Sequence, residues 1–367
     1  MLLPFTKHPP QHQTVDPPLR RALVSAGRKN KIFISPLLRH PTFSQTMLSQ
    51  SDYCMGWVCA LSLEAAAASF MLDEVHPRLP QSSTDSNTYM LGRIGNHNIV
   101  ILCLPNGIYG TTAATASVVQ MRFTFPQIQS AVMVGIGGGV PTTEVDMRLG
   151  DVVVSQPTGT SGGVIQYDYG KTTAGGQFER VGVLNKPPSF FLTALAQLQV
   201  KYMTGSGQVS KEVAKLLAQN PSMKSIFSRP AASNDVLYRS DYDHIASNDT
   251  CALCDESQII HRAPRSENEP VRVHYGLIAS GNQVMKHGRT RDRLAKDLGI
   301  LCFEMEAAGL MDQVPCLVIR GVCDYSDSHK NKDWQGYAAL TAAVFAKELL
   351  SVVSERQNTE PQDTYGM

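Results

Sequence analysis

Short apolar runs alternate with longer segments rich in helix-forming residues from Tyr53 onward. The apolar runs are typical of buried strands, and the longer segments are typical of helices. Strands are expected at 55–61, 96–105, 130–140, 149–157, 271–280, 300–303 and 314–324, and helices at 62–72, 110–125, 188–203 and 334–353, with the start of another at 307–311. This alternation predicts an α/β fold with a mainly parallel or mixed central sheet.

Two regions depart from this pattern. Residues 204–270 are polar and irregular, and we interpret them as a long insertion at the sheet edge. The first 51 residues hold seven prolines, seven Lys or Arg and a single acid, Asp16. Such a segment cannot easily build a core, so residues 1–51 are expected to form a flexible arm, 52–355 one domain and 356–367 a disordered tail.

Composition narrows the class of protein. The 367 residues are 43% hydrophobic, which suffices for one large core or two smaller ones. Lys and Arg total 33 against 32 Asp and Glu, and this balance gives no support for a nucleic-acid or membrane partner. Cysteines within apolar runs suit reduced, packed thiols in the cytoplasm. The basic, acid-poor N-terminal segment could alternatively be an organelle transit peptide. Its prolines, however, would break the amphipathic helix that such a peptide forms.

Two short motifs each leave two interpretations open. "GIGGGV", Gly135 to Val140, lacks the last glycine of a dinucleotide-binding fingerprint. It is either a tight turn that lets backbone approach a ligand or a simple glycine turn. "CALC" carries Cys251 and Cys254 between His244 and His261, which could hold zinc. A single pair of cysteines with unusual histidine spacing is more typical of two reduced thiols than of a zinc site. We therefore predict no metal, and we predict no cofactor.

Three carboxylates follow three different apolar runs. Glu64 comes after 55–61, Glu306 after 300–303, and Asp324 ends 314–324. In open α/β sheets ligands bind outside the carboxyl ends of the strands. A single acid there is adequately explained as a helix cap or a first-turn residue, but three are harder to dismiss.

These residues resemble a known family. "CFEMEAAGLM" followed by "VIRGVCDYSD", together with "GIGGGVPTTEVDMRLGDVVVS" and "GLIASGNQVM", is similar to the purine nucleoside phosphorylase and nucleosidase superfamily, over about 53–353. The amino-acid sequence of these motifs is especially similar to the fungal branch of the superfamily. In that branch the domain occurs alone or ahead of NACHT or ankyrin modules in immune-receptor-like proteins. The resemblance implies a three-layer αβα nucleoside phosphorylase-like fold with a mixed central sheet flanked by helices.

The resemblance also implies roles for individual residues. Met305 would pack under the ribose, Glu306 would accept hydrogen bonds from its 2′- and 3′-hydroxyls, and Asp324 would protonate or hydrogen-bond purine N7. Glu304 has no matching role and is expected to be structural or exposed. The glycine loop supplies Gly137 and Gly138, and the base-pocket strand and loop supply Asn282, Val284 and Met285 as binding candidates.

The attacking group distinguishes a hydrolase from a phosphorylase. Phosphorylases of the family cradle phosphate with arginines and a serine, but the matching stretch here, 133–136, is apolar at both positions. Glu64 matches the glutamate with which nucleosidases activate water, and a base for water paired with an acid for the leaving group is the logic of inverting hydrolysis. We therefore favour a purine nucleosidase. A phosphorylase using Arg148, Arg289 or Arg320, and a non-catalytic nucleoside-sensing module, are the alternatives.

The segment after Asp324 bears on the 5′ end of the substrate. His329 and Lys330 are candidate contacts there and would suit a free 5′-hydroxyl or a 5′-phosphate. The alternative is a solvated loop whose lysines face water. The expected partner is thus a purine nucleoside or nucleotide, bound by a homodimer or higher homo-oligomer.

Overall fold

The computed structural model describes residues 48–245, 250–265 and 271–354, and in them one mixed sheet carries the core. Ten strands join it, while β8 and β9 form a separate hairpin. The strands are β1 Met55–Cys59, β2 Glu74–His76, β3 Tyr89–Ile94, β4 His97–Cys103, β5 Ser130–Gly139, β6 Val152–Ser155, β7 Val164–Gln166, β8 Gly170–Thr172, β9 Phe178–Arg180, β10 Val273–Ser280, β11 Ile300–Glu304 and β12 Cys316–Asp324.

Part of the sheet closes on itself, because its end strand β11 also pairs with the central strand β5. The strand order is β11-β10-β6-β12-β5-β1-β4-β3-β2, and the tenth strand, β7, pairs with β10 outside this path. Strands β1 and β12 run parallel to β5, whereas β11 runs antiparallel to it, with Phe303 opposite Gly138. Strands β5, β12, β6, β10 and β11 therefore form a closed ring. The mixed α/β sheet predicted from the sequence is confirmed.

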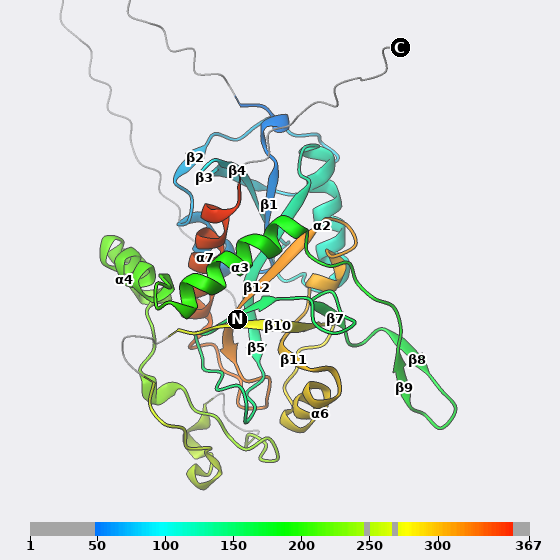
Figure 1. The fold of residues 1–367 in the computed structure, drawn as a ribbon, viewed down its shortest axis with the longest axis vertical. Coiled ribbons are helices and arrows are strands. Elements are labelled where there is room, and N and C mark those ends of the chain that lie inside the picture. The colour runs from blue at the N-terminus through cyan, green and yellow to red at the C-terminus, as the bar shows by residue number, and fades with distance from the viewer. Residues whose placement is uncertain (1–47, 246–249, 266–270, 355–367) are drawn as a thin grey trace, which may run out of the picture. The chain divides into compact units, whose positions relative to one another are not determined.

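Helices cover the sheet on both sides, which gives the expected three-layer arrangement. They are α1 Ser62–Ser69, α2 Thr111–Thr124, α3 Ser189–Met203, α4 Val209–Gln219, α5 Lys224–Phe227, α6 Gly288–Leu298 and α7 Gln335–Val352. Figure 1 shows α7 and α4 on one side of the sheet and α2 and α6 on the other. Short 3-10 turns complete the list: η1 Gln50–Asp52, η2 Pro221–Met223, η3 Ala232–Asn234, η4 Cys251–Leu253, η5 Glu256–Gln258 and η6 Ala307–Gly309.

Helix α7 is the most buried helix because its sequence is apolar on nearly every side. It packs on β12 and β5, and small residues allow the backbones to come close. A Cβ at Gly321 of β12 would collide with the backbone of Ala338, so glycine is required at that contact. This contact fixes β12 to α7 three residues before Asp324.

Three local expectations need correction. The glycines of "GIGGGV" form no turn: β5 continues to Gly139 because these residues pair with both β12 and β11. Residues 307–311 begin only a 3-10 turn, η6, and the chain enters β12 at Cys316. The insertion is not wholly irregular, since it holds the amphipathic helix α4, which packs against α7.

Residues 1–47 and 355–367 lie outside the described residues, and so do the predictions of a flexible arm, a transit peptide and a disordered tail for them. Within the described part of the chain, none of the helices has the length and apolar character needed to cross a membrane.

Candidate active site

The three carboxylates singled out in the sequence line one pocket. Its volume is about 380 Å³. Two larger hollows, of about 900 and 1030 Å³, contain none of the three carboxylates. The smaller pocket is therefore the candidate active site. It is lined by Ala60, Leu61, Glu64, Tyr109, Ile136, Gly137, Gly138, Gln283, Val284, Met285, Phe303, Glu304, Met305, Glu306, Cys323, Asp324, Ser326, Lys330, Lys332 and Gln335.

Glu64 is fixed by the backbone. It lies in the first turn of α1, where Oε2 accepts hydrogen bonds from the N–H groups of Ala60 at 2.7 Å and Leu61 at 3.0 Å. Its Oε1 accepts the N–H of Ile136 at 2.8 Å. A carboxylate has about four acceptor positions, so one is left for a ligand. Burial raises the pKa of Glu64, although Arg320 and the backbone donors act in the opposite direction.

Glu304 and Arg320 form a buried ion pair beneath the pocket. The guanidinium of Arg320 contacts the Glu304 carboxylate, which also accepts the N–H groups of Glu306 and Ala307 at 3.0–3.1 Å. Burial by itself lowers the pKa of Arg320. The charges of Glu304 and Glu306 more than offset this and raise the pKa, so the guanidinium stays charged. Glu304 is thus buried and structural, not exposed, and it shapes the turn that presents Glu306.

Glu306 is the carboxylate least neutralised by partners. Its Oε1 accepts the N–H of Gly110 at 3.3 Å, and its Oε2 is 3.7 Å from Arg320. Burial, followed by repulsion from Glu304, raises the pKa of Glu306 to about 7. This carboxyl group therefore changes charge near neutral pH, in a position where it can meet a ligand hydroxyl.

Asp324 ends β12 and is paired with a lysine. Its Oδ2 lies 2.5 Å from Nζ of Lys330, and its Oδ1 accepts the N–H of Ser326 at 2.9 Å. Burial alone lowers the pKa of Lys330, but the Asp324 carboxylate more than offsets this and raises it. Ser326 has φ of 54°, a left-handed conformation that is uncommon for serine. Backbone strain of this kind gathers at functional sites.

Two glycines of β5 make room for these groups. A Cβ at Gly135 would lie 2.5 Å from Nη1 of Arg320 and would also overlap Glu64. A Cβ at Gly138 would lie 2.7 Å from Oδ1 of Asp324 and would overlap Ser326. The glycine-rich stretch thus lets a strand backbone approach the protein's own carboxylates, which neither interpretation of the motif had foreseen.

Most of the residues proposed from the sequence meet in this pocket, but two do not. Asn282 is directed to the start of α2, where its Oδ1 accepts the N–H and the hydroxyl of Thr111, both at 3.0 Å. His329 is turned away from the pocket, with Nε2 3.0 Å from the carbonyl oxygen of Tyr242. The other proposed residues line the pocket: Glu64, Gly137, Gly138, Val284, Met285, Met305, Glu306, Asp324 and Lys330.

The sequence interpretation missed several lining residues. Ser326 and Lys332 lay within a stretch already singled out, and each could have been found as a polar side chain close behind Asp324. Arg320, which is buried against Glu304 and does not line the pocket, was considered only as a phosphate ligand, although a lone arginine in an apolar strand predicts a buried acidic partner. Tyr109, Gln283, Phe303 and Gln335 carry no signal in the sequence by themselves.

Comparisons with known proteins agree on one protein family. The profile described as "Phosphorylase superfamily" matches residues 55–355. A nucleotide-binding leucine-rich repeat (NLR)-like protein of Hyaloscypha variabilis is 43% identical over 84% of this chain. The chain spans only 30% of that relative's length. A 5′-methylthioadenosine/S-adenosylhomocysteine nucleosidase of Mycobacterium bovis is 23% identical over 82% of this chain and 96% of its own.

Solved structures show the same fold. The structure of a putative 5′-methylthioadenosine/S-adenosylhomocysteine nucleosidase from Borrelia burgdorferi, bound to adenine, is similar to this chain. Its TM-score is 0.52 and its identity 15%, and the match covers 82% of this chain and all of the other. Futalosine hydrolase of Helicobacter pylori is similar with a TM-score of 0.50 and 17% identity, covering 82% and 99%. The expected nucleoside phosphorylase-like fold is confirmed.

Proposed function

Because this chain belongs to the phosphorylase superfamily, we propose that it is a purine nucleosidase, which hydrolyses the bond between a purine and its ribose. The observation that carries the proposal is the meeting of Glu64, Glu306 and Asp324 in one pocket of about 380 Å³. Breaking this bond creates positive charge on the sugar and negative charge on the purine. Carboxylates around the sugar and an acid at the base stabilise both.

Glu64 is the proposed base for water. It lines the pocket, and its three backbone hydrogen bonds hold the carboxylate in one orientation. It takes a proton from water as the oxygen attacks the anomeric carbon. The bond to the purine nitrogen breaks, and its electron pair leaves with the base.

Asp324 is the proposed acid for the leaving purine. It donates a proton toward N7, and the nearby ammonium of Lys330 then stabilises the carboxylate that remains. The hydroxyl of Ser326 is buried and has no hydrogen-bond partner among the described residues. A buried polar group without a partner is costly, so a ligand atom at this position would be favoured.

Glu306 and Met305 are the proposed ribose contacts. An ionised Glu306 accepts hydrogen bonds from the 2′- and 3′-hydroxyls, and the thioether of Met305 packs on the sugar. These contacts fix the sugar relative to Glu64 and Asp324, which gives the rate advantage of a held geometry.

The side chains that line the pocket favour hydrolysis over phosphorolysis. Among the described residues that line it, none is an arginine. Arg148 is paired with Asp146, and Arg289 donates to the carbonyl oxygen of Asp241. Arg320 is fully buried against Glu304. The nucleosidase of Mycobacterium bovis supports the same choice at the level of a relative.

A second candidate function is nucleoside sensing. It is favoured by the relative from Hyaloscypha variabilis, an NLR-like protein in which the matched region is a minor part of the length. In that case the same pocket would bind a nucleoside without fast turnover. A homo-oligomeric state and a cytoplasmic location stay predictions.

The proposed preference at the 5′ end rests on different groups than expected. His329 lies elsewhere, and the ammonium of Lys330 is held by Asp324. Lys332 lines the pocket and forms no ion pair within the described residues. We assign it to a 5′-hydroxyl or 5′-phosphate, and we expect adenosine, inosine or guanosine, or their nucleotides, to be cleaved in preference to methylthioadenosine.

Incubation of the purified chain with a nucleoside panel, with and without phosphate, tests the proposal. Free base with ribose, formed at a rate independent of phosphate, supports the nucleosidase. Ribose 1-phosphate formed only with phosphate identifies a phosphorylase. Tight binding of adenosine without any base release identifies a sensor.

A further inference from the structure

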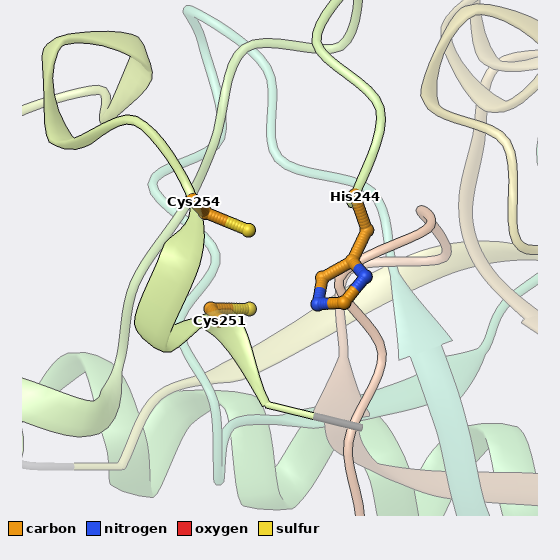
Figure 2. A group of neighbouring side chains, drawn as sticks. All are labelled: His244, Cys251 and Cys254. Atoms are coloured by element: carbon orange, nitrogen blue, oxygen red, sulfur yellow. The ribbon is translucent and has the colours of Figure 1, made fainter. Parts of the chain in front are cut away.

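A second cluster of chemically reactive side chains lies outside the active site. Cys251 and Cys254, at the start and end of the turn containing η4, direct their sulfur atoms toward the ring of His244 (Figure 2). One ligand-capable atom from each of the three lies within 4.8 Å of the others. None of the three lines the pocket that holds Asp324.

His329 completes the cluster from another part of the chain. Its Nδ1 lies 3.8 Å from the sulfur of Cys251 and 3.8 Å from that of Cys254. Its Nε2 is 3.0 Å from the carbonyl oxygen of Tyr242, a partner that can only accept. The ring therefore carries its hydrogen on Nε2 and presents the lone pair of Nδ1 to both sulfur atoms. This backbone partner is the kind that orients metal-binding histidines.

The ring of His329 is also held in place by stacking. Tyr238 lies parallel to it, with centroids 3.9 Å apart and an interplanar angle of 16°. Tyr242 stacks at 5.5 Å. His329 is 8% exposed and Cys254 is 8% exposed, so both are shielded from water. The imidazole is thus preorganised toward the two thiols.

A hydrogen bond to Nδ1 of His329 can satisfy only one of the two thiols. A neutral imidazole nitrogen has one lone pair, so it accepts a good hydrogen bond from only one of the two thiols. A cation would satisfy both sulfur atoms as thiolates and the nitrogen at the same time. In a tetrahedral zinc site, bond lengths of about 2.3 Å to sulfur and 2.05 Å to nitrogen place these ligands about 3.6 Å apart. The observed separations of 3.8 Å match this spacing.

We propose that Cys251, Cys254, His244 and His329 form a structural zinc site. Two thiolates and two imidazoles are a common zinc ligand set, and four protein ligands leave no position open for catalysis. Binding releases the two thiol protons and joins four side chains to one ion. His329, 3.8 Å from both sulfur atoms, replaces His261, which the sequence pattern had offered as a ligand and which is exposed.

The site would join the insertion to the loop that carries the active-site acid. His244, Cys251 and Cys254 belong to the insertion, whereas His329 lies five residues after Asp324 and directly before Lys330. The N–H of His244 already donates to the hydroxyl of Ser328 at 2.9 Å. A bound zinc ion would therefore hold the loop from Asp324 to Lys330 against the insertion.

Metal content of the purified full chain tests this proposal. The chain is produced with zinc in the medium, dialysed against metal-free buffer, and analysed by mass spectrometry of the metal. We expect about one zinc per chain, the stoichiometry of a single closed site. Cys254→Ser and His329→Gln should each lose most of it. His261→Gln and Cys103→Ser are matched controls and should retain it.

Cobalt gives a readout that is independent of enzyme activity and of the folding of variants. The wild-type chain is stripped with a chelator, checked by circular dichroism, and titrated with Co²⁺. A thiolate-to-cobalt charge-transfer band, with the intense visible bands of tetrahedral cobalt, supports the site, as does a rise in Tm on adding zinc. Absence of these bands, equal zinc in Cys254→Ser and His261→Gln, or a Cys251–Cys254 disulfide that persists under reducing conditions would overturn it.

Discussion

The ammonium of Lys330 lies 2.5 Å from Oδ2 of Asp324, and both groups are largely shielded from water. This ion pair places a positive charge directly beside the proposed acid. The ammonium can therefore neutralise the carboxylate that remains once Asp324 has donated a proton. The same contact occupies the lysine that the sequence had suggested for the 5′ end of the substrate.

Asp324→Asn should lower turnover by about 10²–10⁴-fold, the usual contribution of a proton donor. The amide keeps the shape of the side chain but has no acidic proton. Base release from adenosine measures the effect. Asp333→Asn, an exposed residue nearby in the sequence, is the control and should be near wild type. More than about a tenth of the wild-type rate in Asp324→Asn would remove Asp324 from this role.

Glu64→Gln should block attack by water while nucleoside binding persists. The amide cannot take a proton, and its NH₂ group cannot accept from the backbone N–H groups that now hold the carboxylate. A loss of about 1–3 kcal/mol in the free energy of unfolding should accompany the loss of activity. Calorimetric binding of adenine separates the two effects, and Glu179→Gln, exposed in β9, is the control. Undiminished hydrolysis in Glu64→Gln would show that another group activates water.

The raised pKa of Glu306, about 7, predicts two opposite pH effects. In the free protein this carboxyl binds a proton more tightly than in the unfolded chain, where the pKa is 4.5. Its contribution to stability is therefore complete below about pH 4.5 and is lost as pH rises through 7. Ribose binding needs the ionised form, so KM should fall as pH rises from 6 to 8.

Glu306→Gln tests both effects together. The variant should flatten the dependence of Tm on pH between 5 and 7.5 and remove the change in KM across neutrality. Burial also raises the pKa of Glu64, which contributes to the slope that remains. An unchanged pH profile of KM in Glu306→Gln would argue against the ribose contact.

Gly138→Ala should reduce both activity and stability. The new methyl group would lie 2.7 Å from Oδ1 of Asp324 and overlap Ser326, so the end of β12 must shift. Overpacking of this kind costs about 1–3 kcal/mol. Gly276→Ala is a suitable comparison, because its methyl group would meet only the flexible end of Leu301. Equal Tm and equal turnover in the two variants would contradict the proposed fit.

Lys332→Ala should weaken cleavage of a nucleotide while sparing that of the nucleoside. An exposed lysine binds phosphate as a point charge, so KM for adenosine monophosphate should rise several-fold and the effect should fade at high salt. Competition between adenosine, adenosine triphosphate and methylthioadenosine at equal concentration measures the wild-type preference. A clear preference for methylthioadenosine would refute the polar 5′ pocket.

The sequence by itself determined the alternation of strands and helices and the identity of the three carboxylates. Apolar runs such as 55–59 and 316–323 form β1 and β12 because only burial stabilises such segments. The family resemblance, drawn from Met305, Glu306 and Asp324 in their local motifs, is confirmed by the profile match and the fold. The roles of these residues stay predictions.

The reason that the carboxylates meet is tertiary. The sequence argument placed the three carboxylates at the carboxyl ends of three strands, but β11, which leads to Glu306, runs antiparallel to β5. Glu306 reaches the pocket because the pairing of β11 with β5 closes the ring of strands. Strand direction depends on pairings between residues far apart in the chain, which local patterns do not encode.

The partners of each charge were likewise decided only by the folded chain. Arg320 lies in β12 and Glu304 at the end of β11, and their buried pairing follows from the closed ring. His329 lies five residues after Asp324 in the sequence, yet its ring turns to Cys251 and Cys254 of the insertion. Side-chain direction depends on which distant segment packs against the loop, and this contact is set by burial in three dimensions.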